Sequence, residues 1–305
     1  MKRLIAPALA LTIAPLAGAQ IPRTAGGHPD FQGVWENQFW TGLERPSDVS
    51  GLVLDRAEGE RLLVEEAEAR VARASLNQTY GLMPPRVWAM VRGESRSSMV
   101  TAPPDGRLPL TPLARSLRPA GPPTVDNPEE RSAPERCLGS LGMAPLMVAS
   151  ENNFRRFVQT PDYLMIHTEE SNHARIISLA SGPAPPEAMR TRQGHSVGRW
   201  EADTIVVETT HIDGKFPLRG GNRSLLFVGA GSRIIERFSL VGPDELLYEF
   251  TIHDPDLYAA PWSAEYSMTR SNARMFESAC HEGNYALANM LSGGRQTNSA
   301  GAARQ

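Results

Sequence analysis

The chain has no excess of basic residues and, after its first residues, no long apolar run. Its 31 Lys and Arg against 34 Asp and Glu leave a net charge of −3, whereas a nucleic-acid-binding domain carries a basic patch. No internal stretch approaches the roughly 20 apolar residues that a membrane-spanning helix needs. We therefore expect no nucleic-acid partner and no insertion into a membrane.

The motifs that mark common cofactors and nucleophiles are also missing. There is no Gly-x-Ser-x-Gly, no phosphate-binding glycine loop, no dinucleotide fingerprint and no His-Glu-x-x-His. The glycine-rich run at 229–232 stands between two predicted strands with no helix after it, which is typical of a turn. The sequence predicts no organic cofactor, and our preferred interpretation includes no metal.

The chain has only two cysteines, and its first residues predict the compartment that decides whether they form a disulfide. Residues 1–19 combine a positive start, an apolar run over 4–16 and a small-residue cleavage site. This pattern is typical of a signal peptide and predicts a periplasmic or secreted protein. In such an oxidising compartment Cys137 and Cys280 are expected to form a disulfide, which the chain-entropy model allows about 4–5 kcal/mol of stabilisation. A free nucleophilic thiol is the alternative.

From residue 155 onward the chain is rich in short β-strand patterns separated by turns. The hairpin 195–210 is the clearest, because β-branched residues from Thr204 to Thr210 follow a turn at 201–203. A long antiparallel meander must close or stack to avoid exposed edges, so we expect a mainly β fold whose meander closes into a lipocalin-like barrel. A two-sheet sandwich is the second choice. The predicted strands are 157–160, 163–167, 174–179, 195–200, 204–210, 225–228, 233–240, 246–253, 264–268 and 275–280.

Two details of this β region are specific enough to check. Leu246, Tyr248, Phe250 and Ile252 alternate with other residues and should share one face of their strand. A turn at 241–245 would place Arg237 opposite Glu249 as a cross-strand ion pair.

The N-terminal part predicts fewer regular elements. Gly33 and Trp35 favour a short first strand at the barrel floor, and residues 54–76 favour an amphipathic helix, capped by Asp55 and packed across a sheet or barrel end. Residues 82–135 are irregular, either a surface wrap or a lid over a site, with a short helix starting at Thr111-Pro112. The predicted organisation is a signal peptide (1–19), an N-terminal strand, helix and wrap (20–135) packed as one domain with an antiparallel β domain (136–290), and a disordered tail (291–305).

Histidine, glutamate and arginine side chains are concentrated in the β half, where six of the seven histidines lie. Each of these side chains, taken alone, is typical of a strand residue whose hydrogen bonds are satisfied or of a cross-strand ion pair. Neighbouring strands could nevertheless bring several onto one barrel face, where imidazole exchanges protons near neutral pH and arginine stabilises an oxyanion. The candidate catalytic residues are His173, His195, Arg175, Glu208 and His253, and the candidate substrate-binding residues are Trp200, Tyr248 and Arg199.

A metal centre is the alternative role for the same histidines. Three imidazoles with an open position form a catalytic zinc or iron site. The candidates are His173, His195, His211 and His253, whose spacings contain no diagnostic pair.

Five motifs resemble a family of exported, largely uncharacterised bacterial proteins, common in Gram-negative bacteria that grow on plant-derived and aromatic carbon. The motifs are Glu135-Arg-Cys-Leu138, Val158-Gln-Thr-Pro-Asp-Tyr163, Ala174-Arg-Ile-Ile177, Gly198-Arg-Trp-Glu-Ala-Asp-Thr-Ile-Val-Val-Glu-Thr-Thr210 and Cys280-His-Glu-Gly-Asn-Tyr285. The resemblance implies an association with cofactor-free lyases that act on lignin-derived aromatic dimers and release formaldehyde from a hydroxymethyl side chain. This chain departs from the family pattern by carrying His173, His195 and His253 where the pattern has an acid. That change fits either drift on a solvated face or a site adjusted to proton transfer near neutral pH.

The leading hypothesis is a periplasmic, cofactor-independent lyase that acts by acid–base elimination on a small hydroxylated aromatic compound. In it His173 and His195 exchange protons, Arg175 stabilises a phenolate or alkoxide, Glu208 orients a histidine and Trp200 stacks on the ring. The alternatives are a lipocalin-like protein that binds or transports a small molecule, and a histidine-ligated metal-dependent hydrolase or oxygenase. An apolar lumen with the histidines outside would favour binding, and convergent polar groups would favour catalysis.

Overall fold

The computed structural model describes residues 20–37, 39–74, 87–118, 127–131, 135–139, 141–148, 154–180, 182–219 and 225–302. The predicted signal peptide, 1–19, lies outside these residues. The elements in chain order are β1 (Gly33–Glu36), α1 (Arg56–Ala74), β2 (Ala89–Val91), β3 (Glu94–Arg96), β4 (Val100–Ala102), α2 (Pro112–Ser116), η2 (Pro128–Glu130), β5 (Phe154–Gln159), β6 (Tyr163–Thr168), η3 (Glu170–Asn172), β7 (His173–Ser178), β8 (His195–Glu201), β9 (Thr204–Thr210), β10 (Leu218–Arg219), β11 (Leu226–Phe227), β12 (Arg233–Gly242), β13 (Glu245–His253), β14 (Trp262–Ser271) and α3 (Tyr285–Ala302).

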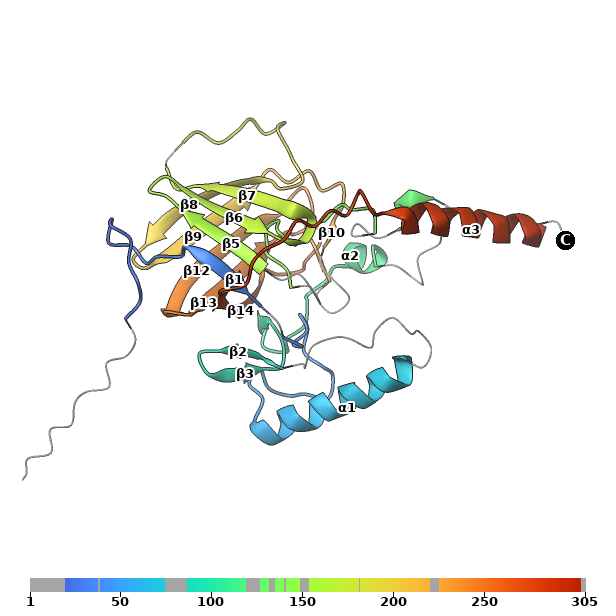
Figure 1. Ribbon diagram of the computed structural model, residues 1–305, viewed down its shortest axis with the longest axis horizontal. Helices are drawn as coiled ribbons and strands as arrows, with labels where there is room; N and C mark the ends of the chain where they lie inside the picture. Colours follow the sequence, from blue (N-terminus) through green and yellow to red (C-terminus); the bar gives the residue numbers. More distant parts are fainter. Residues whose placement is uncertain are drawn as a thin grey trace, which may run out of the picture.

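Nine strands form a closed barrel (Figure 1). They hydrogen-bond in the order β1-β5-β6-β7-β8-β9-β12-β13-β14, and β14 pairs back with β1. Every neighbouring pair in the ring is antiparallel except β7 and β8, which run parallel. A ring with an odd number of strands needs at least one parallel pair, because strict alternation of direction closes only on an even number. The predicted mainly β barrel is confirmed, with this one interruption of the antiparallel meander.

Side chains of alternating strand residues fill the barrel interior. The prediction for 246–253 is confirmed, since all four residues of the alternating set are buried. Their rings pack closely: Tyr248 lies 5.0 Å from Phe238 and 5.1 Å from Tyr266, measured between ring centroids. The inward side chains of β12 and β13 are Ile234, Glu236, Phe238, Leu240, Leu246, Tyr248, Phe250 and Ile252.

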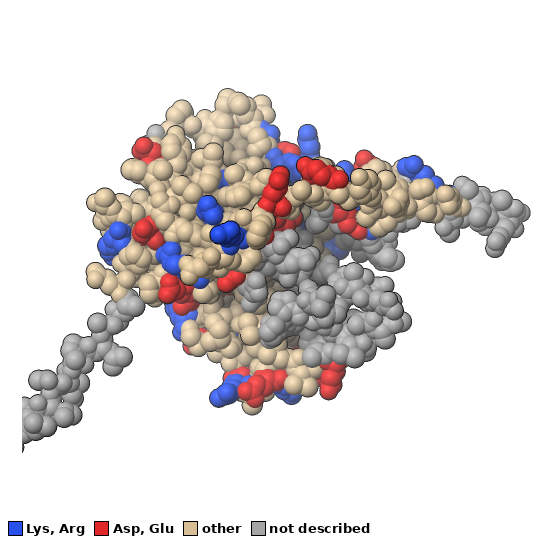
Figure 2. Space-filling model, in the orientation of Figure 1, with Lys and Arg blue, Asp and Glu red and all other residues tan. Residues whose placement is uncertain are grey.

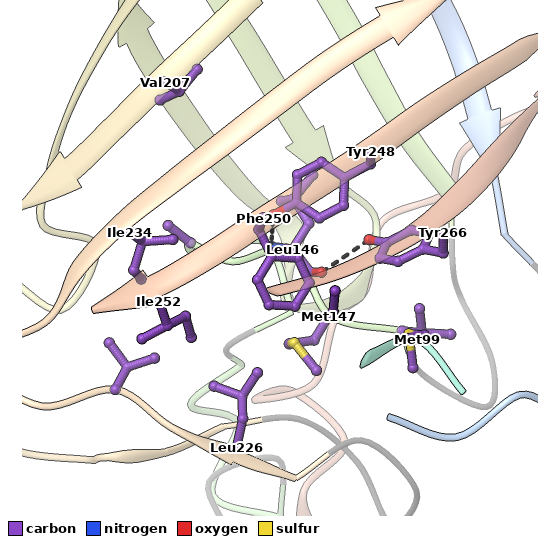
Figure 3. Close-up of a cluster of buried hydrophobic side chains, with 14 of the residues drawn as sticks. Met99, Leu146, Met147, Val207, Leu226, Ile234, Tyr248, Phe250, Ile252 and Tyr266 are labelled. Carbon is purple, nitrogen blue, oxygen red and sulfur yellow. Dashed lines mark hydrogen bonds between the residues drawn. The ribbon is translucent and has the colours of Figure 1, made fainter. Parts of the chain in front are cut away.

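A segment from outside the sheet, residues 141–148, packs into one end of the barrel and is called the plug segment below. All of its residues are buried. The backbone N–H of Leu146 donates to the Tyr248 hydroxyl at 2.8 Å, and the Tyr266 hydroxyl donates to the Leu146 carbonyl at 2.9 Å (Figure 3). Arg155 also donates to the Met147 carbonyl. In the described residues, core side chains and the plug segment thus occupy the space where a hollow barrel would hold a ligand.

The N-terminal residues pack against the barrel and confirm the predicted first strand. Trp35 of β1 is fully buried, with the Arg270 guanidinium 4.3 Å above its ring. Gly33 has φ +122, and a Cβ there would lie 2.9 Å from Arg270 Nη1, so only glycine suits this position. Arg23 pairs with Asp203 at 2.6 Å, which fastens the incoming chain to the β8–β9 turn.

Outside the barrel, the predicted N-terminal helix forms as α1, with Asp55 Oδ1 accepting the Glu58 N–H at 2.8 Å as a cap. It packs beside the β2–β3 hairpin and not across a barrel end (Figure 1). The contact is close because Gly59 has no side chain: a Cβ would lie 3.2 Å from Trp88 Nε1. Leu62 is buried here, whereas the side chains at 67, 71 and 72 lie outside the described residues.

The region predicted as an irregular wrap or lid, 82–135, contains regular structure where it is described. The β2–β3 hairpin stands beside the barrel, and β4 adds to β14 outside the ring. The predicted short helix is confirmed as α2, capped by Thr111, whose side chain accepts from Ala114 N–H at 3.2 Å. Residues 82–86, 119–126 and 132–134 lie outside the described part of the chain.

The C-terminal part corrects two predictions. No strand forms at 275–280, because β14 already pairs with β13, β1 and β4, so the closed ring leaves no edge there for it. In place of a disordered tail at 291–305, α3 extends over Tyr285–Ala302 and projects from the barrel (Figure 1). Asn284 accepts the Leu287 N–H at its start, and Leu291 is buried.

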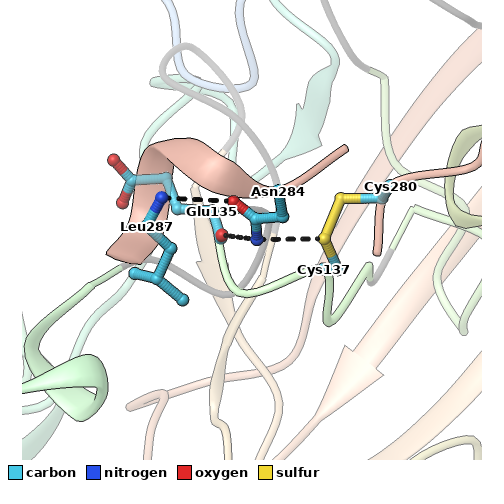
Figure 4. The surroundings of a disulfide bond; sticks show 5 residues. All are labelled: Glu135, Cys137, Cys280, Asn284 and Leu287. Atoms are coloured by element: carbon cyan, nitrogen blue, oxygen red, sulfur yellow. Dashed lines mark hydrogen bonds between the residues drawn. A yellow bond between two sulfur atoms is a disulfide. The ribbon is translucent and has the colours of Figure 1, made fainter. Parts of the chain in front are cut away.

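The predicted disulfide is confirmed: Cys137 and Cys280 are bonded across a sequence separation of 143 residues (Figure 4). The Asn284 amide donates to Cys137 Sγ at 3.3 Å and to the Glu135 carbonyl at 2.9 Å. The bond therefore joins the start of α3 to the chain just before the plug segment. Among the described residues, none of the helices is long and apolar enough to cross a membrane.

Candidate functional site

Four of the eight predicted catalytic and binding residues, His195, Arg199, Glu208 and His253, face the outside of the barrel. Glu208 forms a double hydrogen bond with Arg233, at 2.8 and 2.7 Å, and does not orient a histidine. Arg199 pairs with Glu201 on the surface. His195 and His253 both occupy outward positions of their strands, adjacent to the inward-facing Ser196 and Ile252.

Two further predictions concern the partners of surface and rim residues. Trp200 stacks on His28, with ring centroids 4.1 Å apart and planes 9° apart, and its stacking on a substrate stays a prediction. Arg237 does lie opposite Glu249 in register, as predicted. Its ion-pair partner is however Glu201, at 3.0 Å.

The histidines do not assemble into the alternative metal centre. His195 and His211 are neighbours, with ring centroids 6.2 Å apart, but His211 hydrogen-bonds Thr210 and lies 3.4 Å from Glu187. His253 lies outward on β13 and His173 at the start of β7. The described residues contain no group of three or more His, Cys, Asp or Glu that could hold a metal ion.

Arg175 and Tyr248 do come together, inside the barrel, through a residue that sequence reasoning missed. Glu236 pairs with both terminal nitrogens of Arg175, and the Tyr248 hydroxyl donates to Glu236 Oε1 at 2.7 Å. Ser196 and Thr209 accept from the same guanidinium. Burial alone would lower the pKa of Arg175, but the Glu236 charge raises it. The network is fully paired and supports the plug segment through Tyr248, so its role is structural.

His173 faces the barrel end near this network but has no partner. Both of its ring nitrogens are buried, and neither has a hydrogen-bond partner among the described residues. The Thr168 hydroxyl is likewise buried and without a partner in this part of the chain. Gly142 of the plug segment covers both, since a Cβ there would lie 2.8 Å from His173 Nδ1 and 2.8 Å from Thr168 Oγ1. Burial, followed by the charges of Arg175, Arg192 and Arg219, lowers the pKa of His173 to about 4. At neutral pH this imidazole is uncharged.

A groove of about 570 Å³ lies on the outer wall, between the barrel and the β2–β3 hairpin. Its floor is a row across three strands, in which Thr269 of β14 pairs with Glu36 of β1 on one side and with Glu245 of β13 on the other. Paired residues point to the same face of a sheet, so both carboxylates face the groove. The lining residues are Glu36, Asn37, Val87, Trp88, Met90, Gly242, Pro243, Asp244, Glu245, Ser267 and Thr269.

Asn37 also borders this groove, but its side chain is almost fully buried. Its Oδ1 accepts from Arg155 Nη1, and since a guanidinium only donates, this contact fixes which end of the amide faces Arg155. The Nδ2 is buried and has no partner among the described residues. A buried polar atom without a partner is rare in folded proteins.

The opposite wall of the groove is apolar. Val87 and Met90 are about half exposed, at 54% and 49%, although they are large hydrophobic side chains. Trp88 lies behind them, held by its Nε1 donating to the Gly59 carbonyl at 2.9 Å. None of the described lining residues is Lys or Arg. The groove thus combines an apolar wall with three acidic residues, Glu36, Asp244 and Glu245, and its volume lies within the size range of small-molecule sites.

On the face shown in Figure 2, Lys and Arg side chains are interspersed with Asp and Glu over the barrel and around α1.

One signal in the sequence could have located Glu236. It stands between Ile234 and Phe238 in a strand whose alternate residues are apolar, so an inward-facing acid was readable. No local pattern marks Asn37 or Met90, which come from segments 53 residues apart and meet only in the fold.

Fold and site together define a closed nine-stranded barrel with a filled interior and a polar–apolar groove on its outer wall. The chain matches no family model, no curated protein and no solved structure.

Proposed function

We propose that this is an exported protein that binds a small hydroxylated aromatic molecule in the outer groove. The observation that carries the proposal is the meeting of the Glu36 and Glu245 carboxylates with the half-exposed apolar side chains of Val87 and Met90 in one groove. The disulfide supports export, because such bonds persist in oxidising compartments. In this proposal the ligand lies in the groove on the outer wall of the barrel and not in the lumen.

The chemistry of the groove selects the kind of ligand. A hydroxyl group donates a hydrogen bond, so it can donate to a carboxylate of the groove. An aromatic ring can lie on Met90, whose sulfur makes favourable contacts with ring edges. Glu245 Oε1 already accepts from Arg92 N–H and the Ser267 hydroxyl, so Glu36 is the freer acceptor. A ligand carboxylate would be repelled by Glu36, Asp244 and Glu245.

Calorimetric titration with 4-hydroxybenzyl alcohol and with 4-hydroxybenzoate tests this proposal. The alcohol should bind several-fold more tightly than the acid. Met90→Arg should abolish binding by filling the groove, whereas Met189→Arg, at another exposed methionine, should leave it unchanged. Tighter binding of the acid, or equal loss in both variants, would contradict the groove as the site.

The lyase expected from the family resemblance remains a second candidate. It is favoured by one observation: His173 is uncharged at neutral pH, has two unpaired ring nitrogens and lies in the field of three arginines. Such an imidazole could accept a proton while an arginine stabilises the resulting anion. Incubation with lignin-type dimers followed by a formaldehyde assay tests it, with His173→Gln against the wild type. Product that persists in the variant would rule out His173 as the base.

A further inference from the structure

Three arginines gather near the plug segment without a carboxylate partner. Arg136 and Arg192 both lie against the ring of Phe216, with the guanidinium carbon 5.4 and 4.9 Å from the ring centroid. Arg219 is adjacent, since its Nη2 donates to the Arg192 carbonyl at 2.9 Å. Among the described residues, no carboxylate lies within ion-pair distance of any of these three guanidinium groups. We call them the arginine cluster.

The backbone holds the cluster in place. Arg192 Nη2 donates to the Leu138 carbonyl at 3.2 Å, and Arg219 Nη1 donates to the Ala144 carbonyl. These contacts connect the disulfide region, the plug segment and the loop before β8. Carbonyl oxygens orient a guanidinium but do not neutralise its charge. The cluster therefore concentrates positive charge at one fixed place.

The nearby acids do not offset this charge. Asp213 and Glu236 are the two carboxylates that act on Arg219, and Glu236 is already paired with Arg175. Burial, with the charges of Arg192 and Arg175, lowers the pKa of Arg219 to about 10. Arg219 is only 4% exposed. A buried charge without a counter-ion is costly, and natural proteins normally pair it.

The surroundings of His173 provide a second observation in the same region. Both of its ring nitrogens and the Thr168 hydroxyl are buried and unpartnered in the described part of the chain. The titratable groups that act on it are Arg175 on its own strand, Arg192, Arg219 and His167 on β6. Unpaired hydrogen-bonding groups and unpaired cations thus meet in one region.

We propose that the arginine cluster binds a small oxyanion, a carboxylate or a phosphate. The planar fork of a guanidinium matches two oxygens of either group, and Phe216 keeps two such forks in position from its ring surface. Arg136 and Arg192 are half-buried, so a ligand in solution can reach them. Arg219 is buried and adds its positive charge from the protein interior. This site shares no residue with the outer groove, which disfavours anions, and so is a second binding site.

Calorimetric titrations of the full chain with inorganic phosphate and with citrate, at constant ionic strength, test the proposal. Saturable binding of at least one is expected; phosphate alone or citrate alone would identify which oxyanion the site takes. Arg192→Gln should weaken binding at least tenfold. Arg233→Gln removes the same charge from a surface pair with Glu208 and should change binding less than twofold. No saturable binding, or an equal loss in both variants, would overturn the proposal.

Two further measurements keep the test valid if Arg192→Gln fails to fold. Phe216→Leu retains all three charges but removes the ring surface, and should weaken binding several-fold. Proton NMR should show the pKa of His173 rising when the anion saturates the protein, because the anion offsets the arginine charges; His173→Gln identifies the signal. Binding that leaves the pKa of His173 unchanged would place the anion elsewhere and overturn the proposed site.

Discussion

Two buried arginines, Arg175 and Arg219, show how differently one residue type is used in this barrel. Arg175 is 1% exposed and meets a carboxylate and two hydroxyl groups, so its charge is offset. Arg219 is 4% exposed and donates only to carbonyl oxygens. The comparison teaches that burial alone does not define a role: the paired arginine supports the fold, and the unpaired one leaves charge for a ligand.

Removing the partner of Arg175 should have the largest effect. Glu236→Gln leaves an uncompensated charge in the barrel interior, and we expect a loss of about 3–5 kcal/mol in the free energy of unfolding. Urea denaturation measures it. Glu208→Gln, which breaks the exposed pair with Arg233, should cost less than about 1 kcal/mol. Equal losses in the two variants would mean that the Arg175 pair is no more structural than a surface pair.

The two tyrosines that hold the plug segment should differ. Tyr248→Phe loses the donation to Glu236 and leaves the Leu146 N–H without an acceptor, so we expect a cost of about 2–3 kcal/mol. Tyr266→Phe loses only the bond to the Leu146 carbonyl, and about 1 kcal/mol is expected. Thermal and urea unfolding of both variants provide the values. A larger cost at Tyr266 would contradict the place of Tyr248 in the Arg175 network.

Acid should destabilise the protein through His173. Its pKa is about 4 in the fold against 6.5 in the unfolded chain. Between these values the unfolded chain binds more protons, so stability is complete above pH 6.5 and is lost as the pH falls toward 4. The loss should reach about 1–2 kcal/mol after screening by solvent. His173→Gln should flatten this part of the stability profile, and an unchanged slope would show that other groups cause it.

The smallest effect is expected at Arg219 itself. Arg219→Met loses two bonds to carbonyl oxygens but removes a buried charge, so without added anion its stability should lie within about 1 kcal/mol of the wild type. Urea denaturation in a buffer free of phosphate and carboxylates is the measurement. A loss as large as that of Glu236→Gln would show that Arg219 is as structural as Arg175.

The sequence was sufficient for the barrel because strand alternation is a local signal. The inward set of 246–253, the 195–210 hairpin, the first strand at Trp35 and the cysteine pair all follow from periodicity, turn residues or compartment. The parallel contact of β7 with β8 did not follow, since it depends on the strand count of the closed ring.

The functional residues were harder to predict because alternation also decides which way a side chain points. His195, Glu208 and His253 occupy outward positions, adjacent in sequence to the buried Ser196, Thr209 and Ile252. A shift of one residue reverses the face, so a cluster of polar residues in sequence does not imply convergence in space. The groove was harder still to predict from the sequence, because its lining residues come from β1, the β2–β3 hairpin and the β13–β14 pair.

Methionine-methyl NMR tests most directly whether the ligand binds outside the barrel. Met90 is about half exposed in the groove, and Met147 is buried in the plug segment. On titration with 4-hydroxybenzyl alcohol, the Met90 methyl signal should shift and saturate while that of Met147 stays in place. A saturating shift at Met147 with none at Met90 would mean that the ligand enters the lumen, which would contradict binding in the outer groove.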